Sequence, residues 1–134
     1  MCDALVGTWK LTVNNSDDFS KFLEAVGVNF ITRQAVSHLK PDVIISKNGD
    51  EWSINTLSTF KNTELKFKLD EEFDEITADG RKVKSEIAWK DGVLIQKQTW
   101  DGKECAITRE VKDGRLITTC MIGDVKCVRI YDKK

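Results

Sequence analysis

Features that mark several other classes of protein are missing from this 134-residue chain. Basic and acidic residues nearly balance, with a formal net charge of −1, so no basic surface for nucleic acid is indicated. No stretch is apolar enough and long enough to span a membrane. Residues 1–4 lack the basic and apolar regions of a signal peptide. We therefore expect a cytoplasmic protein that binds no nucleic acid, with nuclear entry left open.

Patterns for metal binding and catalysis are also scarce. The chain has one histidine, His38, and its four cysteines form no CxxC pair, so we expect neither a metal site nor a cofactor. There is no GxSxG motif and no Cys/His arrangement, so His38 is expected at the surface or in a lid, and an enzyme is disfavoured. Cys120 and Cys127 should face each other as two buried thiols, with a disulfide as the alternative.

Turn signals, by contrast, are frequent. The length suits one domain with a sizeable core. Asp-Gly or Gly-Asp pairs occur at 91–92, 101–102, 113–114 and 123–124, and tight hairpins accept the positive φ of such residues. If residues pair symmetrically about these turns, the register places five side chains on one face of one sheet. These are Trp89, Leu94, Arg109, Thr118 and Arg129.

The alternation of side chains indicates which way this face points. Apolar and polar residues alternate over 82–90 and over 104–112, the period of a half-buried strand. The turn register joins both apolar faces, which directs Arg109, Arg129 and Tyr131 into an apolar interior. An outward Arg129, with its neighbours inward, stays open because its strand alternates less cleanly.

Short strands and turns account for nearly all of the remaining chain. A first strand is expected over 5–14, followed by a helical lid over about 16–39, with Ser16 as its N-cap and a second helix over 30–39. The acidic segment 70–75 is expected to form a solvated turn and an edge strand. Ten meandering strands favour an all-β fold in a single domain, residues 1–134. We predict a ten-stranded antiparallel up-and-down β-barrel, or β-clam, around a cavity and capped by the helix-turn-helix.

Two buried guanidinium groups need compensation, because an unpaired buried charge is costly. The predicted face offers Arg109 and Arg129 no acid, so internal water or an anionic ligand must supply it. Their backbones should lie roughly 10 Å apart, two strand spacings, so both side chains can converge on one carboxylate. The Tyr131 hydroxyl is a further donor. A long-chain carboxylate with its hydrocarbon part on the apolar face fits this site.

Motifs along the whole chain resemble those of the intracellular lipid-binding proteins, in the fatty-acid-binding branch. They are GTWK (7–10), STFKNTE (58–64), EEFDE (71–75), TADGRKVKS (77–85), WDGK (100–103), ITRE (107–110) and VRIYDKK (128–134). The resemblance implies a lidded ten-stranded barrel that carries one fatty acid without catalysis, with Arg109, Arg129 and Tyr131 as its carboxylate site. Retinoic-acid carriers share these three residues, so retinoic acid is the alternative ligand.

The resemblance also implies a portal beneath the lid, gated by Phe60. Residues expected at the cavity or portal are Phe19, Phe22, Phe60, Ala78, Gln98 and Cys120. A monomer is implied, whose lid touches anionic membranes transiently through Lys21 and Lys40, although on sequence alone these are ordinary solvated lysines. The start of the secreted lipocalins resembles residues 7–9 as well, but the missing signal peptide and the count of ten strands argue against that class.

Overall fold

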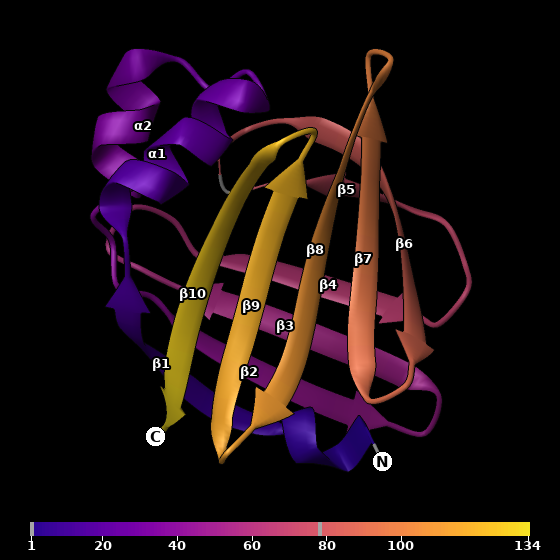
Figure 1. The fold of residues 1–134 in the computed structure, drawn as a ribbon. Coiled ribbons are helices and arrows are strands. Elements are labelled where there is room, and N and C mark those ends of the chain that lie inside the picture. Colours follow the sequence, from indigo (N-terminus) through magenta and orange to yellow (C-terminus); the bar gives the residue numbers. More distant parts are fainter. Residues whose placement is uncertain (1, 78) are drawn as a thin grey trace.

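The computed structural model describes residues 2–77 and 79–134, which form one sheet of ten strands with two short helices at one end (Figure 1). A 3-10 helix, η1 (Cys2–Leu5), comes first, and the two helices α1 (Ser16–Ala25) and α2 (Phe30–Val36) lie between the first two strands. The strands are β1 (Gly7–Asn14), β2 (Asp42–Asn48), β3 (Glu51–Leu57), β4 (Thr63–Lys68), β5 (Phe73–Ile76), β6 (Lys82–Lys90), β7 (Val93–Trp100), β8 (Lys103–Lys112), β9 (Arg115–Ile122) and β10 (Val125–Lys133).

The sheet closes on itself almost completely. Its order is β4-β3-β2-β1-β10-β9-β8-β7-β6-β5, an antiparallel meander in which β1 joins β10. In the described part of the chain no ladder joins β4 to β5, so these two strands remain the edges of the barrel. The predicted fold, a nearly closed ten-stranded barrel with a helical cap, is confirmed.

The Asp-Gly turns set the register as expected. Asp91 has a φ of 51° and Gly92 a φ of 82°, and the turns at 101–102 and 113–114 have the same positive signs. Positive φ at both central residues is typical of the hairpin turns that match strand twist. The predicted row of paired residues, from β6 to β10, is confirmed. Trp89 pairs with Leu94, Leu94 with Arg109, Arg109 with Thr118, and Thr118 with Arg129.

The first strand begins later than predicted. Residues 2–5 form η1, and β1 starts at Gly7, whose φ of 144° turns the chain into the strand. Leu5 is fully buried, and its carbonyl accepts a 2.9 Å hydrogen bond from Trp9 Nε1. Leu5, which suggested the start of a strand, therefore packs in the core at this end of the barrel.

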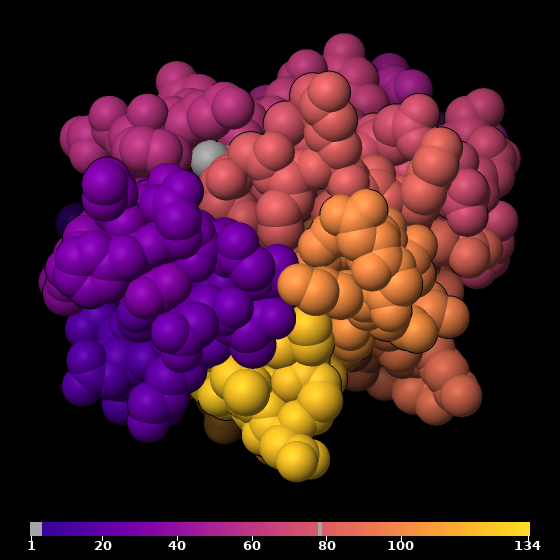
Figure 2. Space-filling view, turned by 90° about the horizontal axis from the view of Figure 1, so that it is seen from above, coloured from indigo at the N-terminus to yellow at the C-terminus, as the bar shows by residue number. Residues whose placement is uncertain are grey.

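The helices cover the opposite end, where they lie beside the β7–β8 and β9–β10 hairpins (Figure 2). The N-cap of α1 is Asn15 and not Ser16, because the Asn15 side chain accepts the Asp18 backbone N–H at 3.1 Å. The second helix ends at Val36 and not at residue 39. Helix α1 packs on β10 and β9, whereas α2 packs mainly on α1. No helix in the described residues has the length and apolar character needed to cross a membrane.

Two buried apolar clusters divide the interior. One, around Leu5, Trp9 and Trp52, fills the end at η1. The other, beneath the lid, joins Phe19 and Phe22 to the three cysteines of β8, β9 and β10. Members of both clusters line the cavity described below.

Candidate ligand cavity

A cavity lies inside the barrel below α1 and is lined by side chains from the lid and from most of the strands. Its walls are partly apolar, with Val43, Ile54 and Leu65 among the lining residues. The charged side chains that line it are Arg81, Arg109, Arg129, Glu75 and Asp79. The interior is therefore neither a dry core nor a polar channel.

The three residues predicted for the carboxylate all line this cavity. Arg129 is 8% exposed and Tyr131 is 5% exposed, while Val128 on the same strand is 39% exposed. The alternative in which Arg129 faces outward is therefore wrong. Arg109 is half-buried and lies in the same row of the sheet as Arg129, with Thr118 between them.

Arg109 is held by an amide. Its Nη1 donates a 2.8 Å hydrogen bond to Gln96 Oε1, and Gln96 Nε2 donates to Glu75 Oε1 at 2.9 Å. The two bonds fix the Gln96 amide with its oxygen toward Arg109. Burial lowers the pKa of the Arg109 guanidinium. An arginine nevertheless keeps its charge in proteins, so the group remains a cation.

Arg129 lies against the lid. Its guanidinium carbon is 3.9 Å from the centroid of the Phe19 ring, a close cation–π contact with helix α1. Its Nε is buried and has no hydrogen-bond partner among the described residues. The ring stabilises the charge, but it does not satisfy the N–H group.

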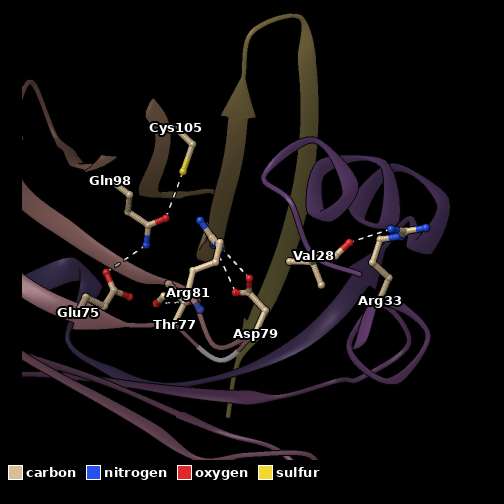
Figure 3. Close-up of polar contacts among 8 residues, drawn as sticks. All are labelled: Val28, Arg33, Glu75, Thr77, Asp79, Arg81, Gln98 and Cys105. Atoms are coloured by element: carbon tan, nitrogen blue, oxygen red, sulfur yellow. Dashed lines mark hydrogen bonds and ion pairs between the residues drawn. The ribbon is translucent and has the colours of Figure 1, made fainter. Parts of the chain in front are cut away.

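Glu75 is a cavity residue that the sequence reasoning missed. The expectation that no acid shares the arginine face is wrong. Segment 70–75 does form a turn and an edge strand as predicted, but Glu75 is not solvated. Its Oε1 accepts hydrogen bonds from Ser85 Oγ at 2.6 Å and from Gln96 Nε2 at 2.9 Å. It also accepts one from Gln98 Nε2 at 3.0 Å (Figure 3). Strand period was the available signal, because Glu75 pairs with inward-facing Val83 of β6.

Asp79 and Arg81 form a second pair that was not anticipated. Arg81 Nε and Nη2 donate to the two Asp79 carboxylate oxygens at 2.6 and 3.3 Å (Figure 3). Both side chains are largely buried, 6% exposed for Asp79 and 13% for Arg81. This pair lies just before β6, where sequence alone indicated only a turn.

The other predicted lining residues are distributed over two spaces. Phe19, Phe22, Gln98 and Cys120 line the cavity. Phe60, 45% exposed, lines a smaller adjoining pocket that also reaches Phe19 and Arg129. Ala78 lies outside the described residues.

The three cysteines of the apolar cluster beneath the lid are free thiols. Cys120 and Cys127 pair across β9 and β10 as predicted, and neither is part of a disulfide. Burial raises the pKa of Cys127 to about 12 and that of Cys105 to about 11. These groups are therefore neutral at physiological pH and do not offset the positive charge of the arginines.

A nearly closed barrel with a two-helix lid, apolar walls and inward arginines has the architecture of a β-barrel that binds amphipathic small molecules. Residues 6–134 match the model of the lipocalin / cytosolic fatty-acid binding protein family. The chain therefore belongs to this family, as the resemblance of its motifs indicated.

Individual relatives span the whole chain. An adipocyte fatty acid-binding protein of Pygoscelis papua is 49% identical over 133 residues, which is 99% of each chain. The fatty-acid-binding protein 1 of Echinococcus granulosus has a structure similar to this one, with a TM-score of 0.93, 38% identity and 98% of both chains covered. The fatty acid binding protein of Schistosoma mansoni, solved with arachidonic acid, gives a TM-score of 0.94 at 36% identity and covers 99% of this chain and 98% of its own.

Proposed function

We propose that this protein is a non-enzymatic carrier of long-chain fatty acids that holds the ligand carboxylate with Arg109, Arg129 and Tyr131. The observation that carries the proposal is Arg129: its side chain is buried, it lines the cavity, and its Nε has no partner among the described residues. A buried cation is costly unless an anion or an acceptor compensates it.

The charges of the cavity favour one carboxylate. Three arginines and two acids line it, which leaves a formal charge of +1. Burial raises the pKa of Tyr131, so its hydroxyl stays protonated and can donate to a carboxylate. The apolar wall residues would contact the hydrocarbon chain. A monocarboxylate would neutralise the cavity.

The relatives support the class of ligand. Proteins named for fatty-acid binding cover nearly the whole chain, and one of them was solved with arachidonic acid. By this analogy we place the carrier in the cytoplasm and expect it to act as a monomer, with Phe60 near the ligand entrance. Retinoic acid remains the alternative, because it too presents a carboxylate on an apolar body.

Calorimetric titration of delipidated protein with oleate and, in parallel, methyl oleate tests the proposal. We expect tight 1:1 binding of the acid and much weaker binding of the ester, which lacks the charge. The Arg129→Gln variant should lose about 1.5–3 kcal/mol of oleate binding, the range for a hydrogen bond to a charged group. Equal binding of acid and ester would refute the carboxylate site.

Displacement separates the two candidate ligands. Retinoic acid is added to the oleate complex, and the released oleate is measured. We expect retinoic acid to compete poorly, so that oleate stays bound at equimolar competitor. Efficient displacement, together with weak direct binding of oleate, would assign the cavity to retinoic acid instead.

We further propose that the lid contacts anionic membranes during ligand transfer. At the start of α2, Phe30 is 62% exposed and Ile31 is 80% exposed, and the lysines Lys21 and Lys40 are exposed nearby in sequence. Exposed apolar side chains combined with basic residues favour binding at the interface of an anionic bilayer. Because α2 packs mainly on α1, it can make this contact without disturbing the sheet.

A further inference from the structure

Arg81 is the third arginine of the cavity, and one of its guanidinium nitrogens has no hydrogen-bond partner among the described residues. Its Nε and Nη2 hold Asp79, and its guanidinium carbon lies 4.7 Å from the centroid of the Trp100 ring. Its Nη1 is buried and has no hydrogen-bond partner among the described residues. A desolvated donor without an acceptor is unfavourable, and most buried polar groups in proteins do have a partner.

The surroundings of Arg81 hold it in place. Its backbone N–H donates to Thr77 Oγ1 at 3.0 Å, and its carbonyl accepts from the Thr77 N–H at 2.9 Å. The amide oxygen of Gln98 already accepts from Cys105 Sγ at 3.1 Å, while its nitrogen donates to Glu75 (Figure 3). The Gln98 amide and Thr77 are therefore engaged. The Cys105 sulfur also lies against the Arg81 guanidinium, but sulfur is a weak acceptor, so Arg81 Nη1 can still take a ligand oxygen.

The Arg81 guanidinium lies beside Cys105, a member of the apolar cluster beneath the lid, and like Arg109 and Arg129 it also acts on the Cys120 thiol. Arg81 partly offsets the burial that raises the pKa of the Cys105 thiol, which places its guanidinium near Cys105. On β8, Cys105 precedes Arg109 by four residues, about 13 Å of strand. A chain that begins with a carboxylate at Arg109 and Arg129 would reach Arg81 further along its length.

The charge of the cavity decides what kind of group fits there. A second carboxylate would leave the three arginines and two acids with an excess of negative charge once the first carboxylate is bound. A neutral oxygen would satisfy the donor without that cost. We propose that Arg81 Nη1 forms a second ligand subsite, which takes a neutral acceptor oxygen, a hydroxyl or oxo group, on the chain of an oxygenated fatty acid. This proposal rests on the proposed fatty-acid function and narrows its ligand class.

Oleate and ricinoleate, which differ by one hydroxyl in the middle of the chain, test the subsite by calorimetry on delipidated protein. We expect ricinoleate to bind at least as tightly as oleate. A cavity without a free donor would bind it roughly tenfold more weakly or worse, because the hydroxyl would be buried unpaired. Oleate binding with such a loss for ricinoleate would overturn the subsite alone, whereas failure of oleate to bind would overturn the proposed function.

A variant assigns the contact to Arg81. Arg81→Lys retains a positive charge beside Asp79 but lacks the planar fork that places Nη1. The affinity ratio of ricinoleate to oleate should fall about tenfold in this variant. The matched control is Arg115→Lys, which alters a surface pair with Asp132 and should leave the ratio unchanged. An unchanged ratio in Arg81→Lys would overturn the assignment.

A second ligand keeps the test valid if that variant does not fold. The oxo analogue of ricinoleate can accept a hydrogen bond but cannot donate one. Because Arg81 Nη1 is a donor, we expect the wild-type protein to bind the oxo acid about as tightly as ricinoleate. Tight binding of ricinoleate with tenfold weaker binding of the oxo acid would place the hydroxyl on an acceptor such as Asp79 and overturn the role of Arg81.

Discussion

The guanidinium of Arg129 lies on the ring of Phe19, 3.9 Å from its centroid, so a lid helix and the proposed carboxylate site share one contact. Phe19 belongs to α1, which packs on β10, the strand that carries Arg129. A desolvated contact of this kind contributes up to about 2 kcal/mol. The position of the lid and the orientation of the arginine are therefore coupled.

Phe19→Leu should weaken oleate binding roughly three- to tenfold, because Arg129 loses the ring that orients it. Calorimetry measures the affinity, and urea unfolding measures the accompanying loss of stability, expected at about 1 kcal/mol. Phe22→Leu is the matched control, since Phe22 stacks on Phe19 with ring centroids 6.4 Å apart in the same helix. An equal loss of affinity in both variants would mean that the rings act only by packing.

Glu75→Gln should strengthen oleate binding. The substitution removes a negative charge from the cavity, while the amide oxygen can still accept the hydrogen bonds of Gln96 and Gln98. We expect a gain of roughly 1 kcal/mol for a charge screened as in a partly buried site. The affinities for oleate and methyl oleate are compared by calorimetry, and only the acid should respond.

Glu72→Gln controls for this change, because Glu72 is exposed and lies in the same acidic segment. It should leave oleate affinity within error of the wild type. Weaker oleate binding in Glu75→Gln would show that the ionised carboxylate is needed to orient Gln96 toward Arg109, and that this positioning outweighs the charge effect.

Glu75 also shows what the sequence could and could not reveal. The row from Trp89 to Arg129 was predictable because Asp-Gly turns require positive φ and so fix which residues face each other. The inward direction followed from two clean alternations. Glu75 was missed because it lies in a run of acidic residues, which is typical of a solvated segment. The three side chains that donate hydrogen bonds to it come from two other strands. Side-chain networks across strands leave no local pattern in the sequence.

The lid illustrates a different limit. Its two helices were predicted from apolar spacing and cap residues, and both formed. The start of the first helix moved by one residue because Asn15 and Ser16 are both good N-caps, and only the geometry of the entering chain decides between them. The Asp79–Arg81 pair was hidden for a similar reason, since nothing in the sequence shows that a polar turn will lie over Trp100.

Stability should fall in alkaline solution as the buried thiols ionise. In the unfolded chain a thiol loses its proton near its ordinary pKa of 9.0, but burial raises the pKa of Cys105 to about 11. Between these values the unfolded state binds fewer protons, so unfolding becomes more favourable as pH rises. The contribution of Cys105 is complete below pH 9 and is lost by about pH 11.

Urea unfolding from pH 8 to pH 11 measures this dependence. Cys105→Ala should lower stability at every pH, because it also removes the bond to Gln98, but its stability should decline less steeply above pH 9 than that of the wild type. Parallel curves for the two proteins would show that Cys105 does not titrate in this window and that other groups cause the alkaline loss.

Ile31→Asp should slow the transfer of ligand to membranes without changing its affinity. Ile31 is 80% exposed, so the substitution removes no packing, but it places a negative charge where the lid is proposed to meet an anionic bilayer. Transfer of a fluorescent fatty acid to vesicles containing phosphatidylserine is followed by stopped flow.

Val128→Asp is the control, because Val128 is a partly exposed apolar residue on the barrel wall. A rate set by collision with the membrane should fall several-fold only for Ile31→Asp and only with anionic vesicles. Equal rates for both variants and the wild type, independent of vesicle charge, would mean that the ligand leaves through water and that the exposed tip of α2 has no part in transfer.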